Sequence, residues 1–143
     1  MTTLGTLSSI TLDFTTGPIA NTLLAHRILT HIQSIHGPHL THRALESLYF
    51  QYFTQRLHPS AQTTLITACE AAGLEKEEVE VLVGDESVAL AETKGLIREA
   101  EGNGVDSVPC VVVEGRKRDF TLIGAKEEHD YLKTLEQVVK EAR

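Results

Sequence analysis

Several residue types that often signal a function are scarce in this chain of 143 residues. It has no tryptophan, and aromatic residues make up only 5% of it. The two cysteines, Cys69 and Cys110, lie far apart and form no Cys-x-x-Cys motif, so no disulfide framework is predicted. This cysteine usage is compatible with a reducing compartment, and we expect a cytoplasmic protein.

Long apolar runs and an excess of basic charge are also missing. No apolar stretch approaches the roughly 18–20 residues of a membrane-spanning helix. The first residues have no basic region followed by a continuous apolar core, so they do not have the pattern of a signal peptide. The formal net charge is −7, whereas a nucleic-acid-binding surface needs a basic face. We therefore expect neither nucleic acid nor membrane as a partner.

The remaining composition is that of a folded protein. Hydrophobic residues make up 41% of the chain and charged residues 23%, which allows a packed core. The length fits a single domain over residues 1–143. Apolar residues at helical spacing, with glycine and proline at the boundaries, predict helices over residues 18–36, 39–56, 61–72, 75–83, 86–101 and 126–141. Ser60 is the predicted N-cap of the third of these helices, and Gly73 is predicted as the C′ residue that follows it.

Two short strands are predicted near the C-terminus. Residues 110–114 begin with the β-branched run Cys-Val-Val-Val, and residues 118–123 follow after a turn. Pro109 stands directly before the first strand, where it donates no hydrogen bond to a sheet. The predicted fold is α+β and mostly helical, with a helical part over 18–101 and a strand–strand–helix part over 104–143. Residues 8–14 alternate in polarity and are a candidate for an extra strand.

Three short motifs occur in order along the chain. They are Asn21-Thr22 with Ala25-His26-Arg27, then Ala71-Ala72-Gly73-Leu74, and then Gly104-Val105 with Ser107-Val108-Pro109 and Gly124-Ala125. Together they resemble the DsbA-like thioredoxin-fold family, and most closely its 2-hydroxychromene-2-carboxylate isomerases and FrnE-type oxidoreductases. The resemblance covers most of residues 13–140. It implies a truncated DsbA-like thioredoxin fold in which Pro109 follows a cis peptide bond, an isomer that is uncommon in folded proteins.

One part of the family pattern has no counterpart in this sequence. Family members begin with a strand–helix–strand unit that carries a Cys-x-x-Cys motif or a serine-containing turn, whereas this chain leads almost directly into the helix of Asn21 and Arg27. Disulfide exchange needs an attacking thiolate and a resolving partner, which Cys110 alone does not supply. We therefore expect no disulfide oxidoreductase activity and no cofactor. The glutathione site of the isomerase subgroup is also in doubt.

The apolar strand 110–114 lacks its family neighbour in this arrangement. Natural proteins rarely leave such an edge unpaired. Either residues 8–14 provide a substitute strand, or two chains join into a homodimer. Both arrangements are compatible with each other.

The candidate site lies between the start of helix 18–36 and the Val108-Pro109 turn, because the resemblance places these segments face to face. In that reading His26 is the catalytic acid or base and Arg27 binds an anionic group of the substrate. Asn21 orients a substrate oxygen or caps the helix. Val108, Pro109 and Cys110 complete the substrate-binding set.

Some of these residues have plainer alternatives. His26 is equally compatible with a buried, hydrogen-bonded histidine. Cys110 is either a nucleophile or, more in keeping with its apolar neighbours, a small packed residue. Six histidines fall within 33 residues, His26, His31, His36, His39, His42 and His58. No cysteine or carboxylate in that stretch completes a ligand set, so we expect solvent-facing histidines and no metal site.

Two functions follow from these observations. The first is a cofactor-independent isomerase or cyclase of metabolite biosynthesis, acting on an aromatic or polyketide-type small molecule. The second is a non-catalytic, dimeric binding or scaffold module derived from a DsbA-like oxidoreductase. An enclosed pocket of roughly a few hundred Å³ that His26 or Arg27 enters would favour the first.

Overall fold

The computed structural model describes residues 20–142, which fall into two compact units, one ending at Gly95 and the other starting at Leu96. The candidate strand at residues 8–14 lies outside the described residues. None of the described helices is long and apolar enough to cross a membrane. The fold is α+β and mostly helical, as the sequence predicts. That the two units make one domain stays a prediction.

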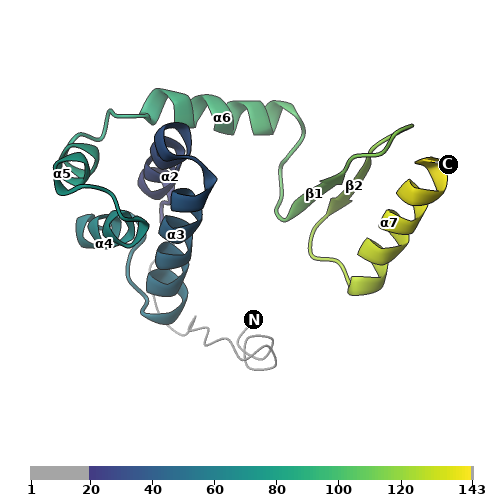
Figure 1. The fold of residues 1–143 in the computed structure, drawn as a ribbon, viewed down its shortest axis with the longest axis horizontal. Helices are drawn as coiled ribbons and strands as arrows, with labels where there is room; N and C mark the ends of the chain where they lie inside the picture. Colours follow the sequence, from purple (N-terminus) through teal and green to yellow (C-terminus); the bar gives the residue numbers. More distant parts are fainter. Residues whose placement is uncertain (1–19, 143) are drawn as a thin grey trace. The chain divides into compact units, whose positions relative to one another are not determined.

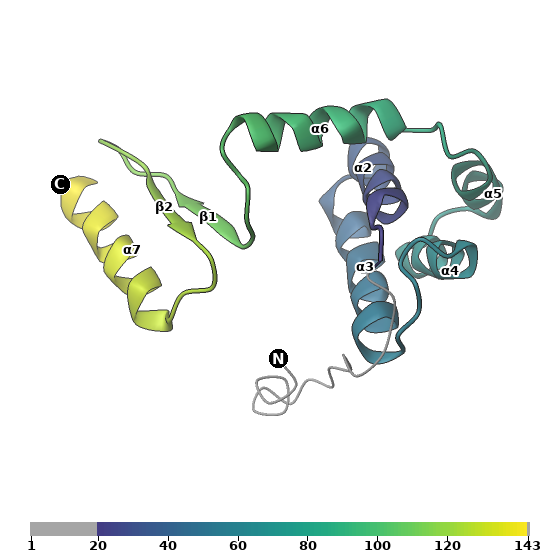
Figure 2. The same cartoon turned by 180° about the vertical axis from the view of Figure 1, so that it is seen from behind.

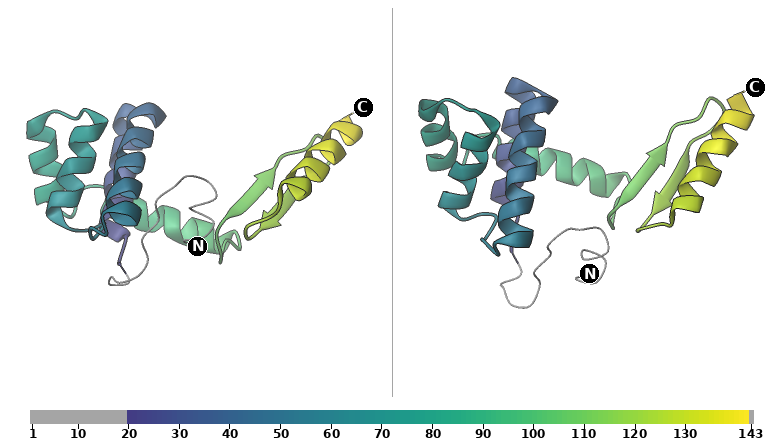
Figure 3. Two further views of the ribbon diagram at one scale, coloured as in Figure 1. Left: turned by 90° about the horizontal axis from the view of Figure 1, so that it is seen from below. Right: turned by 60° about the horizontal axis from the view of Figure 1, so that its bottom comes forward.

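The first unit is built from helices (Figure 1). They are α2 (Leu23–His36), α3 (Pro38–Tyr49), α4 (Gln62–Ala72) and α5 (Lys76–Gly84), and the π-helix η1 (Phe50–Thr54) continues α3. Helix α3 packs against both α2 and α4, and α5 packs against α4. The pairs α2 with α3 and α4 with α5 are seen side by side in Figure 3. The predicted helix 39–56 is therefore an α-helix that changes to π geometry after Tyr49.

Apolar side chains at helical spacing form the core of this unit. Ile28 and Ile32 of α2 are fully buried, whereas Ile35 of the same helix is 63% exposed. The rest of the core comes mainly from α3, α4 and α5, with Ala44, Leu48, Leu65, Ala68, Cys69, Ala72, Val79 and Leu82 buried. Removal of this apolar surface from water is the main source of stability for the helical unit.

Of the two predicted boundary residues of α4, the structure confirms the one at the C-terminal end and not the one at the N-terminal end. Gly73 ends the helix with a left-handed backbone, φ 93°, as predicted. The predicted N-cap at Ser60 is wrong, because Ala61 occupies the cap position and no side chain caps the helix. The Ser60 hydroxyl donates a hydrogen bond to the Asn21 carbonyl instead. Ser60 thus ties the loop before α4 to the residues before α2.

Helix α6 (Leu90–Gly102) continues across the boundary between the two units. It begins later than predicted, after Ala89, whose φ is 58°. A left-handed residue cannot continue a right-handed helix, which explains the shorter α6. Leu96 and Ile97 of α6 are 51% and 40% exposed.

The second unit is a β-hairpin with one helix (Figure 2). Strands β1 (Cys110–Val113) and β2 (Phe120–Ile123) are antiparallel, with Val111 opposite Leu122. Helix α7 (Glu128–Ala142) contacts β1. The Val108–Pro109 peptide bond is cis, the isomer that the resemblance implies. The Pro109 carbonyl accepts a hydrogen bond from the Gly124 N–H at 2.8 Å.

Part of the apolar surface of α7 is exposed. Tyr131 and Val138 are half-buried, but Leu132, Leu135 and Val139 are each more than half exposed. A helix on a two-stranded hairpin buries only one stripe, and these three residues lie at i, i+3 and i+7 on another. Helix α7 therefore has more apolar side chains than the hairpin of the second unit covers.

Candidate functional site

The residues before α2 are held by Asn21. Its side-chain oxygen accepts a hydrogen bond from the Leu23 N–H at 2.9 Å, at a helix start where Thr22 provides no side-chain cap. This bond satisfies one of the free N–H groups at the beginning of the helix. Asn21 therefore caps the helix, which is one of the two roles that the sequence allows.

His26 is exposed on the first turn of α2. Its Nδ1 lies 2.9 Å from the Thr22 carbonyl oxygen. A carbonyl oxygen only accepts hydrogen bonds, so Nδ1 carries the proton in this contact. In a neutral imidazole the lone pair is then on Nε2, for which the structure shows no partner within residues 20–142. His26 is thus an exposed imidazole. The Thr22 carbonyl orients its Nδ1, and its Nε2 has no partner within residues 20–142.

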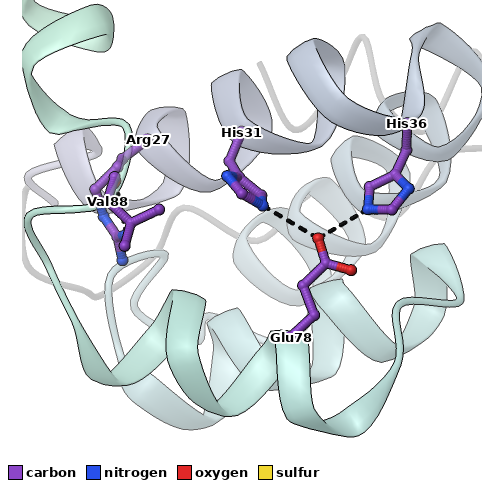
Figure 4. Close-up of polar contacts among 5 residues, drawn as sticks. All are labelled: Arg27, His31, His36, Glu78 and Val88. Carbon is purple, nitrogen blue, oxygen red and sulfur yellow. Dashed lines mark hydrogen bonds and ion pairs between the residues drawn. The ribbon is translucent and has the colours of Figure 1, made fainter.

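Arg27 is fully buried and donates to three backbone carbonyls. Nη2 donates to Leu82 O at 2.7 Å, and Nη1 donates to Asp85 O at 3.1 Å and to Val88 O at 3.0 Å. These carbonyls belong to the end of α5 and the connection to α6, and Figure 4 shows Arg27 beside Val88. The guanidinium thereby holds the chain after α5 against α2.

Burial and charge act on Arg27 in opposite directions. Burial lowers the pKa of Arg27 from its usual value, and the carboxylates of Glu86 and Asp85 offset part of that effect. The guanidinium is nevertheless charged at neutral pH. Its Nε is buried and has no hydrogen-bond partner in the described part of the chain. Of the three guanidinium nitrogens, only Nε therefore has no partner within residues 20–142.

A pocket of about 260 Å³ lies beside Arg27 in the first unit. Leu24, Leu65 and Val83 give it an apolar side, and its polar lining includes Arg27, Gln62 and Glu86. His26 is not among its lining residues, because adjacent residues of a helix point about 100° apart. Of the two proposed catalytic residues, Arg27 therefore lines this pocket and His26 does not.

The other predicted site residues belong to the second unit. Val108 is 83% exposed, Pro109 is exposed, and Cys110 is half-buried with a free thiol. The remaining cysteine, Cys69, lies in the core of the first unit, where burial and the charge of Glu78 raise its thiol pKa to about 11. Cys69 is thus a protonated core residue at neutral pH. A site that joins Val108 and Pro109 to the start of α2 stays a prediction.

A polar cluster in the first unit was not predicted from the sequence (Figure 4). The Nε2 atoms of His31 and His36, both on α2, lie 3.1 Å and 2.8 Å from the same carboxylate oxygen of Glu78 on α5. Burial raises the pKa of Glu78, but hydrogen bonds from His36 and His31 outweigh it and leave the pKa below its usual value. No signal in the sequence links Glu78 to these histidines, which lie more than 40 residues away.

Within residues 20–142, no group of three histidine, cysteine, aspartate or glutamate side chains is arranged to hold a metal ion. The contacts of His31 and His36 to Glu78 are hydrogen bonds between α2 and α5.

These features define a mostly helical α+β protein whose hairpin is entered through a cis-proline. A family model described as the DSBA-like thioredoxin domain matches residues 1–136, so the chain belongs to this family. A comparison with curated proteins found no match. The narrower assignment to the isomerase and FrnE-type subgroup stays a prediction, as does the absence of the N-terminal strand–helix–strand unit.

Proposed function

We propose that this DsbA-like protein is a cofactor-independent isomerase or cyclase that moves a proton on a small metabolite. The observation that carries the proposal is His26, an exposed imidazole whose Nδ1 is oriented by the Thr22 carbonyl. The proposal places the protein in the cytoplasm because its cysteine usage suits a reducing compartment. It places the substrate among aromatic or polyketide-type molecules because of the subgroup resemblance.

In this proposal His26 performs the proton transfer. The free Nε2 removes a proton from an acidic position of the substrate, and the resulting imidazolium returns it at a second position or to a ring-closing oxygen. Such a reaction needs a positioned acid–base group and no electron acceptor. The proton moves between the substrate and His26, and the electron pair stays on the substrate. The reaction therefore involves no oxidation or reduction and needs no cofactor.

The other predicted site residues take supporting roles. Asn21 and Arg27 keep the start of α2 and the end of α5 in place, since their polar atoms mostly serve the backbone. The proposed role of anion clamp for Arg27 rests on the Nε–H and on the second N–H of Nη2, because the other three N–H groups of the guanidinium donate to carbonyls. Val108, Pro109 and Cys110 remain proposed substrate contacts.

Disulfide exchange is not part of the proposed function. The sequence has two cysteines and no Cys-x-x-Cys motif. Cys69 is buried with a raised pKa, which disfavours the reactive thiolate. Cys110 has no second thiol near it in sequence to resolve a mixed disulfide.

The proposal can be tested before the substrate is known. An enzyme that removes and returns a carbon-bound proton exchanges that proton with solvent. We expect the protein, incubated with a metabolite extract in D₂O, to produce a product or substrate that is heavier by one deuterium in mass spectrometry. His26→Ala should lower the labelling rate by about 10²–10⁴-fold.

His39→Ala is the matched control, since His39 is an exposed histidine on α3 with no described partner. It should label at the wild-type rate. Circular dichroism should show that both variants are folded. Equal labelling by wild type and His26→Ala would exclude His26 as the acid–base group.

A second candidate function is a binding module that forms homodimers. The observation in its favour is the apolar surface of the second unit, which includes Val112 and Ile123 of the hairpin and Leu132, Leu135 and Val139 of α7. Exposed apolar side chains gathered on one small unit are typical of interaction surfaces. A dimer is compatible with either function.

A further inference from the structure

Asn103 and Gly104 directly follow α6, in the segment that leads to the hairpin, and both are exposed. We propose that Asn103 is a site of spontaneous covalent modification, in which the Gly104 backbone nitrogen attacks the Asn103 side chain and converts its amide to a carboxylate. This inference goes beyond the proposed function and does not depend on it, because the reaction uses neither His26 nor a substrate.

The reaction involves two neighbouring groups and water. The Gly104 nitrogen forms a bond to Cγ of Asn103, and the bond from Cγ to Nδ2 breaks. The amide group leaves as ammonia with the proton of the Gly104 N–H, and a succinimide ring remains. Water then opens the ring at either carbonyl, which gives an aspartyl or an isoaspartyl residue at position 103. Neither step is an oxidation or a reduction, so water is the only co-reactant.

Gly104 leaves the attacking nitrogen easy to reach. A residue with a Cβ shields its own backbone nitrogen, whereas glycine does not. A Cβ added at Gly104 would meet nothing within 4 Å. The φ angle of Gly104 is 77°, in the left-handed region that glycine adopts without strain. Packing therefore does not confine the backbone at Gly104.

The Asn103 side chain is free to reach that nitrogen. Within residues 20–142 the structure shows no hydrogen bond to its amide group. The second asparagine of the sequence, Asn21, differs in both respects. Its side-chain oxygen accepts a hydrogen bond from the Leu23 N–H, and the residue after it is the β-branched Thr22. Asn103 should therefore react much faster than Asn21.

Hydrogen bonds at the end of α6 oppose the reaction. The Asn103 N–H donates to the Glu99 carbonyl at 2.9 Å, and the Gly104 N–H donates to the Glu101 carbonyl at 3.0 Å. The second bond must open before the Gly104 nitrogen attacks. Because both bonds lie at a helix end, where helices fray, such opening costs little free energy. We therefore expect the folded protein to react more slowly than the unfolded chain, but at a measurable rate.

The product changes the end of α6. The new carboxylate lies at the C-terminal end of a helix, where the helix dipole disfavours negative charge. It also lies four residues after Glu99, a spacing at which like charges repel each other. An isoaspartyl residue in addition lengthens the main chain by one carbon atom. Modification should therefore loosen the last turn of α6 as the protein ages.

The test follows both asparagines in one sample. The folded protein is incubated at about 37 °C and about pH 7.4 for about four weeks, digested with trypsin and analysed by mass spectrometry. A sample digested before the incubation gives the baseline. We expect the fragment 99–116 to become heavier by about 1 Da and to separate into an aspartyl and an isoaspartyl form. Its rate should be at least about tenfold that of the fragment that contains Asn21.

Asn103→Gln is the matched variant, because the longer side chain would have to close a larger and less favourable ring. Its fragment 99–116 should keep its mass over the same incubation. Amide hydrogen exchange reports the structural consequence. Exchange at Gly104 and Val105 should be about threefold or more faster in aged wild type than in aged Asn103→Gln.

Two results would overturn the inference. One is an unchanged mass of fragment 99–116 in the folded protein after the incubation, with urea-unfolded protein as the sample that shows the reaction is detected. The other is an equal rate at Asn21 and Asn103, which would mean that Gly104 gives no advantage. Neither result bears on deuterium labelling by His26, so the two proposals fail separately.

Discussion

At the scale of single residues, Arg27 has a structural role that its place in a sequence motif does not reveal. Its guanidinium joins α2 to three carbonyls that lie 55 to 61 residues later in the chain. A buried charged group that donates several hydrogen bonds is costly to remove, since its partners are then left unsatisfied. Arg27 therefore contributes to the stability of the first unit whether or not it also meets a ligand.

Arg27→Lys should lower the free energy of unfolding by about 2–4 kcal/mol. Lysine keeps the charge, but a single ammonium cannot reproduce the planar arrangement of donors to Leu82, Asp85 and Val88. Urea unfolding followed by circular dichroism measures the change. Arg98→Lys on the exposed side of α6 is the control and should stay within about 0.5 kcal/mol of wild type. A near-neutral Arg27→Lys would show that the carbonyl contacts add little.

Glu78 should make the stability of the protein depend on pH. Its pKa is lowered in the folded protein below 4.5, because the hydrogen bonds from His36 and His31 outweigh the effect of burial. A carboxylate with a lowered pKa stabilises the folded state above its unfolded pKa, and this contribution is lost as the pH falls through the folded pKa. The contribution is therefore complete at neutral pH and disappears in acid.

Glu78→Gln should cost about 1 kcal/mol at pH 7, and the difference from wild type should shrink as the pH falls below about 4. Chemical unfolding at a series of pH values checks this. Glu77→Gln, one residue away but exposed, should follow the wild-type curve at every pH. A constant difference between Glu78→Gln and wild type from pH 7 to pH 3 would rule out the ionic contribution.

At the scale of helices and strands, two glycines differ in backbone conformation: one needs a left-handed backbone and the other lies within a regular helix. Gly73 ends α4 at φ 93°, a conformation that side chains with a Cβ rarely adopt. Gly95 lies inside α6, and a Cβ added there would meet nothing within 4 Å. The same substitution should thus have opposite effects at the two positions.

Gly73→Ala should lower the free energy of unfolding by about 1–2 kcal/mol, the cost of a left-handed alanine. The nearest atom to the added Cβ is Nη1 of Arg43 at 3.5 Å, an ordinary contact, so the loss comes from the backbone. Gly95→Ala should raise the free energy of unfolding by about 0.5–1 kcal/mol, because alanine favours the helix. Thermal unfolding of both variants gives the comparison, and the same sign for both would contradict it.

At the scale of the whole molecule, the second unit leaves apolar side chains uncovered. Val112 and Ile123 on the hairpin are 54% and 52% exposed. They lie at non-adjacent positions of paired strands, on the side of the hairpin away from Val111 and Leu122. Within residues 20–142 the hairpin has an apolar outer face and no strand paired to either edge, and such edges are a template for pairing with another chain.

We therefore expect a homodimer that includes the hairpin. Light scattering at micromolar concentration should give about twice the chain mass of 15.7 kDa. Val112→Glu should shift the population to monomers, because it places a charge in the apolar contact. Lys117→Glu at the exposed turn is the control and should leave the dimer intact. A wild-type protein that is monomeric at these concentrations would exclude the dimer.

The sequence by itself determined the local features of this protein. The positions of the helices and the hairpin follow from apolar spacing and from glycine and proline, which act over a few residues. The left-handed Gly73 was predictable for the same reason. Family membership was also readable, since the motifs around Asn21, Gly73 and Pro109 occur in order along the chain.

Only the tertiary structure decided the contacts between distant residues. Neither the partners of Arg27 nor the meeting of Glu78 with His31 and His36 leaves a pattern in the sequence, because each pair is separated by 42 to 61 residues. Periodicity also shows which residues share a stripe but not whether anything covers it. Leu132 and Leu135 have the pattern of core residues and are exposed, because the second unit buries only one side of α7.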